Sequence, residues 1–480
     1  MNHDVSLQLT TPASRYDTTE KVAMALIGIG VLGLIVAMFG AGSAFPVLMF
    51  WISLGGLTAG GLLYFRTYLK RPAGIDNDGV MFSGATMRGM LGWIFGIVFT
   101  GFYVILYWAP SNLEHLIRMV DPLSWVMRGM AADQWFFYGT IYTLATVVMG
   151  VRMLIKYRHS RYQIYRTISV VFFQLGFAFI IPYVLVLFNE PEFYFHYFWP
   201  LKYQYLWPGD IDYILRQPGI LGIYMIAFGV VMTVVATPIL TYFFGKRWYC
   251  SWVCGCGGLA ETAGDPFRHL SDKSMKAWKI ERWMVHAVLV FVVVTTALLW
   301  INSATEGGIL GGLSQPFSRA YGFYIGLIFA GVVGVGFYPI MGSRMWCRFG
   351  CPMAATLGLL QKYFSRFRIT TNGGQCISCG NCSTYCEMGI DVRWYAQRGQ
   401  NIIRASCVGC GVCSAVCPRG VLNLENGPRK ARYNGPILIH HDTVSVQLDE
   451  AWKASRPLMP GHAEDIPIFT DADWAQMNGA

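Results

Sequence analysis

Charged residues are scarce in this sequence. Asp, Glu, Lys and Arg make up 13% of its 480 residues, and 54% of the residues are hydrophobic, whereas a soluble globular protein is about 25% charged. The formal net charge of +10 would suit a nucleic-acid-binding protein. The basic residues, however, lie at the ends of apolar segments, which is typical of membrane topology. We therefore expect a membrane protein with no nucleic-acid partner.

Cysteine is absent before residue 250 and after residue 417, and all thirteen cysteines lie between these positions. A disulfide framework usually spreads its cysteines along a small secreted chain. Here they occur in tight local runs, which is the pattern of metal sites. Phosphate-binding motifs are also missing: there is no G-x-x-x-x-G-K-[ST] loop and no G-x-G-x-x-G after a strand. The sequence thus favours metal-based electron chemistry over nucleotide chemistry.

Histidine is nearly absent from the apolar segments. Of the nine histidines only His286 lies in one, so we expect no haem within this chain. Polar or helix-kinking residues in the apolar segments, such as Gln174, Pro182 and Pro238, are candidates for lining a quinone pocket. Kinked helices supported by their neighbours are the alternative for the prolines, and we assign no quinone residue.

Eight apolar segments are each long enough to cross a bilayer, which requires about 20 helical residues. They lie near 22–42, 45–65, 89–108, 135–154, 168–188, 220–244, 284–302 and 321–341. The first 20 residues are polar and lack the pattern of a cleavable signal peptide, so we expect the first segment to be a retained span.

Basic residues concentrate in alternate loops, 66–88, 152–166 and 245–283, while the intervening loops carry few. Under the positive-inside rule, both termini and every cysteine then lie on the cytoplasmic side of the inner (cytoplasmic) membrane. The opposite side receives the aromatic stretch 193–207 (FYFHYFWPLKYQYLW). We interpret that stretch as an interfacial re-entrant or surface segment rather than as a ligand site.

Two runs of four cysteines share one spacing, C-x2-C-x2-C-x3-C, at residues 376–386 and 407–417. Thiolates with this spacing ligate [4Fe–4S] clusters, and in two-cluster ferredoxins the fourth cysteine of each run ligates the other cluster. We therefore predict one cluster on Cys376, Cys379, Cys382 and Cys417, and a second on Cys407, Cys410, Cys413 and Cys386. Structural zinc, which prefers two separated C-x2-4-C knuckles, does not fit this pattern.

Glycines at Gly380, Gly409 and Gly411 suit the tight backbone that wraps such clusters, because a residue without Cβ adopts strained turns at least cost. Pro418 follows the second run, as in the bacterial pattern. Glu387 follows the first run instead, which is a mild departure.

A C-x3-C pair follows the sixth and the eighth apolar segments: Cys250 with Cys254, and Cys347 with Cys351. Both pairs come after a small residue, a basic residue and an aromatic, which indicates an internal repeat. If each pair lies in a helix, positions i and i+4 share a face. The two pairs could supply four metal ligands together, or each could pack as reduced thiols at a helix end. Their recurrence near basic residues favours metal or redox use.

These motifs resemble those of the membrane polyferredoxin-type 4Fe–4S proteins. That family includes the membrane quinol-dehydrogenase subunit of periplasmic nitrate reductase systems, the C-terminal part of the nitrous-oxide reductase regulatory flavoprotein, and a ferredoxin-like cytochrome oxidase assembly protein. The resemblance covers about residues 168–425 and carries Cys250, Cys254, Cys347, Cys351 and Pro352 onto the family's two motifs. In the first copy, Gly255 stands where the family has proline, and Cys256 is additional.

The stretch S-G-A-T at 83–86 resembles an attachment sequence for covalent FMN. The expected topology places it on the wrong side of the membrane for flavin attachment, so we expect no FMN. The alternative is that it caps the third span.

The predicted fold is an all-α polytopic membrane protein with a small bacterial-ferredoxin-like α+β domain that carries two 4Fe–4S clusters. The predicted regions are an N-terminal tail (1–21), a first four-helix membrane region (22–165), a second one with the first C-x3-C motif (166–341), a segment with the second motif and the double-cluster domain (342–425), and a C-terminal arm (426–480).

The predicted function is relay of single electrons between the clusters and the quinone pool or a membrane redox complex, with a cytoplasmic donor or acceptor as a further partner. The sequence leaves open whether the chain is itself an enzyme. One hypothesis is that it is a component of a quinol dehydrogenase. Two alternatives remain: an assembly or metal-reduction factor for a respiratory oxidase, and a relay and docking subunit of a larger respiratory complex.

Overall fold

The computed structural model describes residues 17–70, 88–216 and 220–426. Within them, eight helices are long and apolar enough to cross a membrane. They are Thr18–Ala44, Pro46–Leu69, Met90–Trp108, Gln134–Lys156, Arg161–Leu187, Leu221–Phe244, Met275–Ala304 and Gly311–Gly336. All eight correspond to the segments expected from the sequence, and the protein is a mostly helical, multi-pass chain.

The described residues form two compact units, one within 1–72 and 111–144 and the other within 73–110 and 145–480. The first unit contains α1 (Thr18–Val36), α2 (Gly42–Ala44), α3 (Pro46–Phe50), α4 (Gly56–Arg66), α6 (Glu114–Arg118), α7 (Asp121–Arg128) and the beginning of α8 (Gln134–Lys156). Asp17 and Glu20 form a capping box that starts α1. Small residues let α1 and α4 pack closely, since a Cβ on Gly30 would lie 2.8 Å from Leu57.

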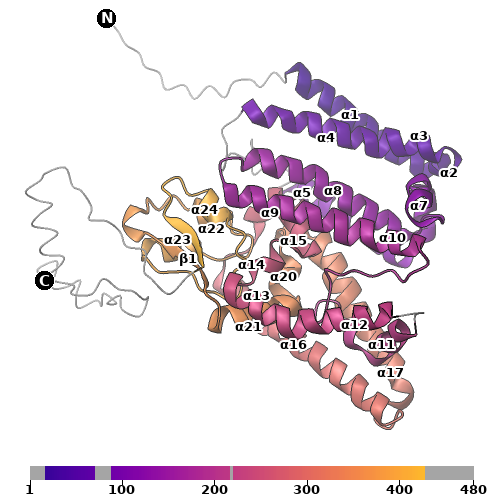
Figure 1. Ribbon diagram of the computed structural model, residues 1–480. Helices are drawn as coiled ribbons and strands as arrows, with labels where there is room; N and C mark the ends of the chain where they lie inside the picture. Colours follow the sequence, from indigo (N-terminus) through magenta and orange to yellow (C-terminus); the bar gives the residue numbers. More distant parts are fainter. Residues whose placement is uncertain (1–16, 71–87, 217–219, 427–480) are drawn as a thin grey trace, which may run out of the picture. The chain divides into compact units, whose positions relative to one another are not determined.

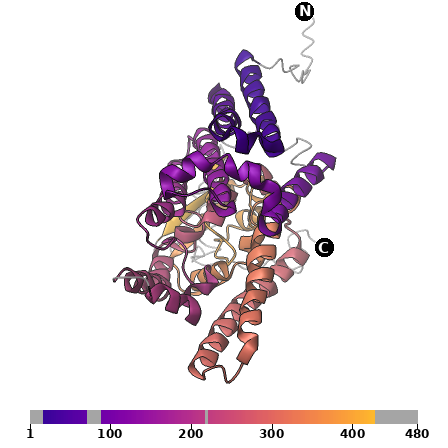
Figure 2. The same cartoon turned by 90° about the vertical axis from the view of Figure 1, so that its right-hand side faces the viewer.

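The second unit contains the remainder of α8 and the helices that surround the cysteines. These are α5 (Met90–Trp108), α9 (Arg161–Phe172), α10 (Ile181–Leu187), α11 (Pro208–Leu215), α12 (Leu221–Val231), α13 (Thr237–Phe244), α14 (Arg247–Cys250), α15 (Gly255–Glu261), α16 (Met275–Ala304), α17 (Ser314–Tyr321), α18 (Gly334–Gly336), α19 (Tyr338–Met341), α20 (Met345–Phe349) and α21 (Pro352–Tyr363). Figure 2 shows α16 and the span that follows it as two neighbouring helices, and the Phe291 and Tyr321 rings, 5.1 Å apart, join them.

Three of this unit's spans contain π-helical segments: Phe173–Ile180, Met232–Ala236 and Gly322–Val333. Such wide turns occur frequently at functional sites. In this chain the spans that contain Met232–Ala236 and Gly322–Val333 are each followed by a C-x3-C pair.

The polar segment after α21 is small and is built around the two cysteine runs. It contains α22 (Asn381–Thr384), α23 (Val392–Gln397), α24 (Val412–Ala415) and two strands, β1 (Phe367–Thr371) and β2 (Leu422–Asn426). The strands pair antiparallel, with Phe367 opposite Asn426 and Thr371 opposite Leu422. In Figure 1 this orange and yellow segment lies together at one end of the second unit. The strands therefore close the segment at its two ends, with both cysteine runs between them.

Candidate metal centres

The two C-x3-C pairs do not lie in single helices, so the expectation of a shared helix face is wrong. Cys250 ends α14 and Cys254 is the N-cap of α15, while Cys347 lies in α20 and Cys351 is the N-cap of α21. The residue before a proline is pushed out of the helical region, and Cys351, before Pro352, is extended at φ −81° and ψ 114°. Each pair therefore spans a turn between two short helices.

The same turn occurs in both pairs. The backbone N–H of Cys254 donates to the Tyr249 carbonyl at 2.8 Å, and the N–H of Cys351 donates to the Trp346 carbonyl at 3.0 Å. In each copy the acceptor is the residue just before the first cysteine. Because both segments make the same hydrogen bond around the same cysteine spacing, the local structure confirms the internal repeat.

Both pairs contribute to one buried core. Cys250, Cys254, Cys347 and Cys351 are each 5–6% exposed and belong to the same hydrophobic cluster. Arg344 joins the two copies, since its Nη1 donates to the Cys250 carbonyl at 3.0 Å and lies 3.6 Å from Cys347 Sγ. The partly buried Cys256 packs against this core as a fifth thiol. We call these five cysteines the membrane-side thiol group.

Burial makes isolated thiolates costly in this group. It raises the pKa of Cys250 to about 12 and raises the pKa values of Cys347 and Cys351. Cys254 is the exception: a hydrogen bond from the Cys256 thiol lowers the pKa of Cys254 to about 7 against the effect of burial. Metal ligands must be deprotonated. A bound metal would supply the positive charge that these buried sulfurs need in order to ionise.

In the polar segment the cysteines of each predicted set lie near one another. Cys376, Cys379 and Cys417 lie within electrostatic reach of Cys382, and all four line one small cavity. The neighbours of Cys413 include the other predicted set, Cys407, Cys410 and Cys386. Cys382 also lies within reach of Cys413, so the two sets adjoin.

The glycine expectation is confirmed. Gly380, Gly409 and Gly411 have φ values of +78°, +63° and +74°, a left-handed region that favours glycine. A Cβ on Gly411 would lie 2.6 Å from the Tyr162 ring. The turn around the second cysteine run therefore needs glycine both for its backbone angle and for its close approach to α9.

Side chains of the helical bundle hold the second cysteine run in place. Gln163 Nε2 and Arg166 Nη1 donate to the Cys410 carbonyl at 2.9 and 2.8 Å, and the Tyr162 hydroxyl donates to the Gly409 carbonyl at 2.7 Å. Two further bonds of 2.8 Å run from Ser251 Oγ to the Val408 carbonyl and from Gln361 Nε2 to the Cys407 carbonyl. The second run thus faces the bundle, whereas Cys379 of the first run is exposed.

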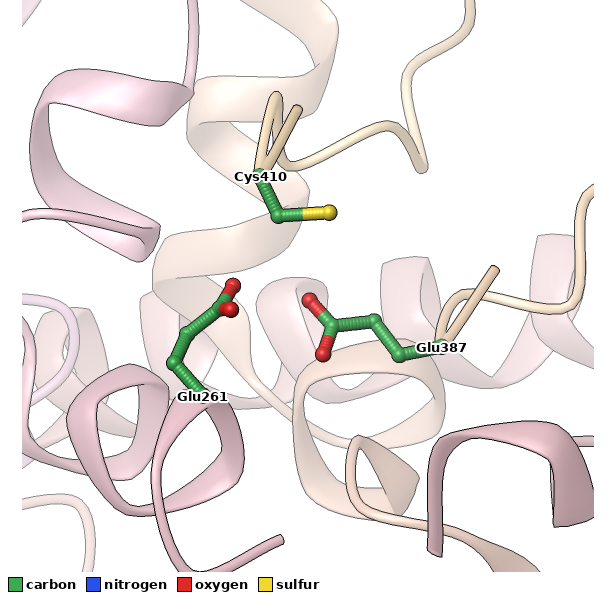
Figure 3. A group of neighbouring side chains, drawn as sticks. All are labelled: Glu261, Glu387 and Cys410. Carbon is green, nitrogen blue, oxygen red and sulfur yellow. The ribbon is translucent and has the colours of Figure 1, made fainter. Parts of the chain in front are cut away.

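Between the cysteine sets and the thiol group lies a buried network of charges. Figure 3 shows Glu261, Glu387 and the Cys410 thiol pointing toward one another. Arginines occupy all four carboxylate oxygens: Arg344 at 2.6 Å from Glu261 Oε1, Arg166 at 2.6 Å from Glu261 Oε2, Arg268 at 2.6 Å from Glu387 Oε2, and Arg344 at 3.0 Å from Glu387 Oε1. This group is therefore an ion-pair network rather than a cation site.

Asp265 extends the network to α8, where it pairs with Arg152 at 2.7 Å and Lys156 at 2.8 Å. Burial opposes the ionisation of Asp265, but the charges of Lys156 and Arg152 outweigh it and hold the pKa well below its usual range. Arg166, Arg268 and Arg344 similarly overcome the burial of Glu261 and lower its pKa. The network has five cations and three carboxylates, so it carries an excess of positive charge beside the cysteines.

Sequence reasoning missed this network. The basic residues of loops 152–166 and 245–283 counted only as indicators of topology, and Glu387 counted only as a departure from a motif. One signal was available: Arg344 precedes Cys347 by three residues, as Lys246 precedes Cys250 by four. Both of these cations are buried beside the thiol group.

The aromatic stretch at 193–207 runs into the bundle, which fits the re-entrant alternative expected from the sequence and not the surface alternative. Phe198 is 1% exposed and its ring lies 5.2 Å from the Tyr249 ring, while the Tyr249 hydroxyl donates to the His196 carbonyl at 2.8 Å. The loop joins the end of the fifth span to the start of the sixth, whereas Tyr249 follows the end of the sixth span. The loop therefore runs back into the bundle to reach Tyr249. Irregular backbone is tolerated at membrane depth where protein buries it, and here it covers one side of the thiol core.

The other residues singled out in the apolar segments lie at different points of the second unit. Gln174 donates to the Val253 carbonyl at 2.9 Å and so supports the first C-x3-C turn. Pro182 lies in the first turn of α10, Pro238 lines an apolar groove against α21, and His286 lines a large cavity beside Cys347. The stretch 83–86 lies outside the described residues.

Comparison with protein families finds iron–sulfur domains in these segments. A 4Fe-4S binding domain matches residues 226–274 and again residues 322–371, one match for each C-x3-C motif. A 4Fe-4S dicluster domain matches residues 368–418. The chain contains 4Fe–4S ferredoxin domains. With its eight apolar helices, it fits a membrane polyferredoxin.

Two curated relatives support the same conclusion. A protein named as electron transport protein YccM of Escherichia coli is 27% identical over 203 residues, covering 38% of this chain and 56% of the relative. The methylamine utilization ferredoxin-type protein MauN of Methylobacillus flagellatus is 27% identical over 155 residues, covering 30% of this chain and 50% of the relative. The chain thus matches about half the length of each. No solved structure matches it. The domains and relatives support iron–sulfur electron transport.

Proposed function

We propose that this polyferredoxin relays single electrons between its clusters and the quinone pool or a membrane redox complex. In this proposal Cys376, Cys379, Cys382 and Cys417 hold one 4Fe–4S cluster, and Cys407, Cys410, Cys413 and Cys386 hold a second. Cys250, Cys254, Cys347 and Cys351 hold a third metal centre, most simply a cluster. Iron–sulfur clusters supply one-electron transfer at potentials tuned by their surroundings.

The observation that carries the proposal is the convergence of the two repeat copies. Residues 97 positions apart, Cys250 and Cys347, meet in one buried core and share Arg344. If these residues served only for packing, the two C-x3-C motifs would not both need two cysteines. Packing would also not need Arg344 beside Cys347 Sγ. The double match of a 4Fe-4S binding domain to these segments gives independent support.

The surrounding residues perform the tasks that a buried redox site requires. Arg344 and Lys246 provide positive charge that favours thiolates. Glu387, next to Cys386, pairs with Arg344, so the network links the second cysteine set to the thiol group. The loop at 193–207 excludes water from one side, and a water-poor site strengthens these interactions. Together they support electron exchange between the polar segment and the bundle.

The test is iron and acid-labile sulfide per chain in anaerobically purified protein, with a potentiometric EPR titration. Two four-iron clusters give about eight irons, and three give about twelve. We expect the higher value, and a fall of about four irons in Cys347→Ser with two EPR signals unchanged.

Cys256→Ser is the matched control, because this fifth thiol is outside the repeated motif; it should retain the full iron content. About eight irons in the wild type, unchanged in Cys347→Ser, would rule out the third centre. Loss of all clusters from a folded Cys347→Ser chain would show a general structural role instead. An absence of reducible iron–sulfur signals would overturn the whole proposal.

A further inference from the structure

A cavity of about 850 Å³ opens beside Cys347, between α16, α21 and the loop at 403–406. Its floor includes buried residues such as Met388 and Ala354, while Trp283 and Tyr363 at its rim are 82% and 64% exposed. It therefore connects the surface of the bundle with the membrane-side thiol group.

Six basic residues line this cavity, against one acidic residue. They are Lys246, Lys279, Arg282, Arg348, Lys362 and Arg404. The acid, Glu281, is already paired with Arg348 at 2.7 Å. The guanidinium groups of Arg282 and Arg404 both lie within 5.5 Å of the Trp278 ring. Like charges gathered around one concave space favour an anionic occupant.

Lys246 is a second, independent indication. It is 2% exposed, and its Nζ donates to one neutral group, the Ala405 carbonyl, at 3.2 Å. An ammonium has three protons to donate, and a buried charge is normally paired with an opposite one. Among the described residues, no carboxylate lies within ion-pair distance of Lys246. Besides acting on the thiol group, the Lys246 ammonium can donate its remaining protons to a ligand anion in the cavity.

An apolar groove of about 370 Å³ lies on the neighbouring face of α21. Leu360 and Phe364 line it, facing Pro238 and Phe243 of the sixth span. Leu359 and Tyr363, one position earlier on the same helix, line the basic cavity. A basic cavity and an apolar groove side by side at the end of a bundle match the two halves of a phospholipid.

We propose that this cavity binds the phosphate headgroup of an anionic phospholipid, with an acyl chain in the groove along α21. Basic pockets at helix ends recognise such headgroups, and the exposed Trp283 suits the interface at this depth. Free phosphate has the same charge chemistry but would leave the groove unused. The lipid phosphate lies beside Cys347 and Lys246, so the membrane's lipid composition tunes the charge around the thiol group. The binding itself does not require metal at the thiols.

The experiment is native mass spectrometry of the purified full chain with added phosphatidylglycerol or phosphatidylcholine, at fixed salt. We expect retention of one phosphatidylglycerol per chain in preference to phosphatidylcholine. The double variant Lys279→Gln/Arg282→Gln, which changes exposed residues at the cavity mouth, should weaken phosphatidylglycerol binding by about tenfold or more. Lys276→Gln/Arg161→Gln removes two exposed basic residues outside the cavity and should leave the binding unchanged.

Three results would overturn the proposal: no preference for phosphatidylglycerol over phosphatidylcholine, equal weakening in both double variants, or binding of inorganic phosphate that displaces the lipid completely at equal concentration. Iron content measured on the same samples separates this site from the cluster proposal. A double variant with full iron and weakened lipid binding supports the lipid site alone, whatever the number of clusters.

Discussion

Arg344 makes four polar contacts within the site. Its guanidinium donates to Glu387 Oε1, to Glu261 Oε1 and to the Cys250 carbonyl, and it lies 3.6 Å from Cys347 Sγ. A planar fork of donors can satisfy this many acceptors at once, which a lysine ammonium cannot do with the same geometry. One buried side chain thus joins both repeat copies and the second cysteine run.

We expect Arg344→Gln to destabilise the protein strongly. Removing one partner of a buried ion pair costs about 3–5 kcal/mol, because one oxygen of Glu261 and one oxygen of Glu387 each lose their arginine in the interior. The stability of Arg344→Lys should lie between that of Arg344→Gln and that of the wild type. Thermal unfolding in detergent, read together with iron per chain, measures both effects.

The matched control is Arg216→Gln, which removes an arginine that is 77% exposed and pairs with Asp212. An exposed pair contributes about 1 kcal/mol or less, so this variant should stay close to the wild type. If both arginine variants unfolded alike, the network would have no special role in stability.

The low pKa of Asp265 predicts how the stability of the protein depends on pH in acid. Its pKa is held well below its usual range in the folded chain, whereas an unfolded Asp titrates near about 3.9. Its stabilising contribution is therefore complete above that unfolded value and is lost as the pH falls toward the folded one. The difference in melting temperature between the wild type and Asp265→Asn should be constant from about pH 5 to 7 and should shrink below about pH 4.

Asp212→Asn, at an exposed position, should show little difference from the wild type at any pH. A gap between wild type and Asp265→Asn that widened on acidification would contradict the sign of this prediction.

At the scale of elements, the short helices around the cysteines take their form from their ends. The N-caps of α22 and α24 are Gly380 and Gly411, both in the left-handed conformation, while the N-caps of α15 and α21 are cysteines in the extended conformation. Cys254 and Cys351 thus lie at helix ends, and Cys382 and Cys413 lie in the first turn of α22 and α24. This explains how runs of close cysteines can point toward common centres.

Gly411→Ala should destabilise the cluster domain more than Gly420→Ala. Both glycines have positive φ, +74° and +61°, and a non-glycine residue in that region costs about 1–2 kcal/mol. At Gly411 the added Cβ would also lie 2.6 Å from the Tyr162 ring, whereas at Gly420 it meets nothing within 4 Å. The measurement is thermal unfolding with EPR of the reduced clusters. Equal losses in the two variants would show that the contact with α9 has no energetic weight.

At the scale of the whole molecule, the charge pattern of the loops predicts one orientation. With the termini and the cysteine segments on the cytoplasmic side, truncated chains ending at 189 or 305 should export a fused alkaline phosphatase and give activity. Chains ending at 160 or 272 should retain it inside and stay inactive, because basic loops remain in the cytoplasm.

Fusions of a fluorescent protein at the same four positions are the reciprocal control, with fluorescence expected at 160 and 272. Phosphatase activity at both members of a consecutive pair would show that the span between them does not cross the membrane, and a reversed pattern would invert the orientation.

Most of the architecture could be read from the sequence because it depends on local, periodic signals. Eight apolar runs of sufficient length predict eight helices, and the structure contains them. The spacing of the eight ferredoxin cysteines predicts which residues gather, since neighbouring ligands lie on one loop and the crossed fourth ligand follows a regular pattern.

The cysteine spacing by itself determined the two predicted ligand sets. The repeated C-x3-C motif determined that the last four spans form two copies of one unit, each a pair of spans followed by the motif. Only the tertiary structure decided that the two copies share one core, that Arg344, Glu261 and Glu387 join it to the second cysteine run, and that the aromatic loop runs into the bundle. These contacts connect residues far apart in the chain, such as Cys250 and Arg344. No local pattern records which buried charges will face each other, because that depends on how the helices pack.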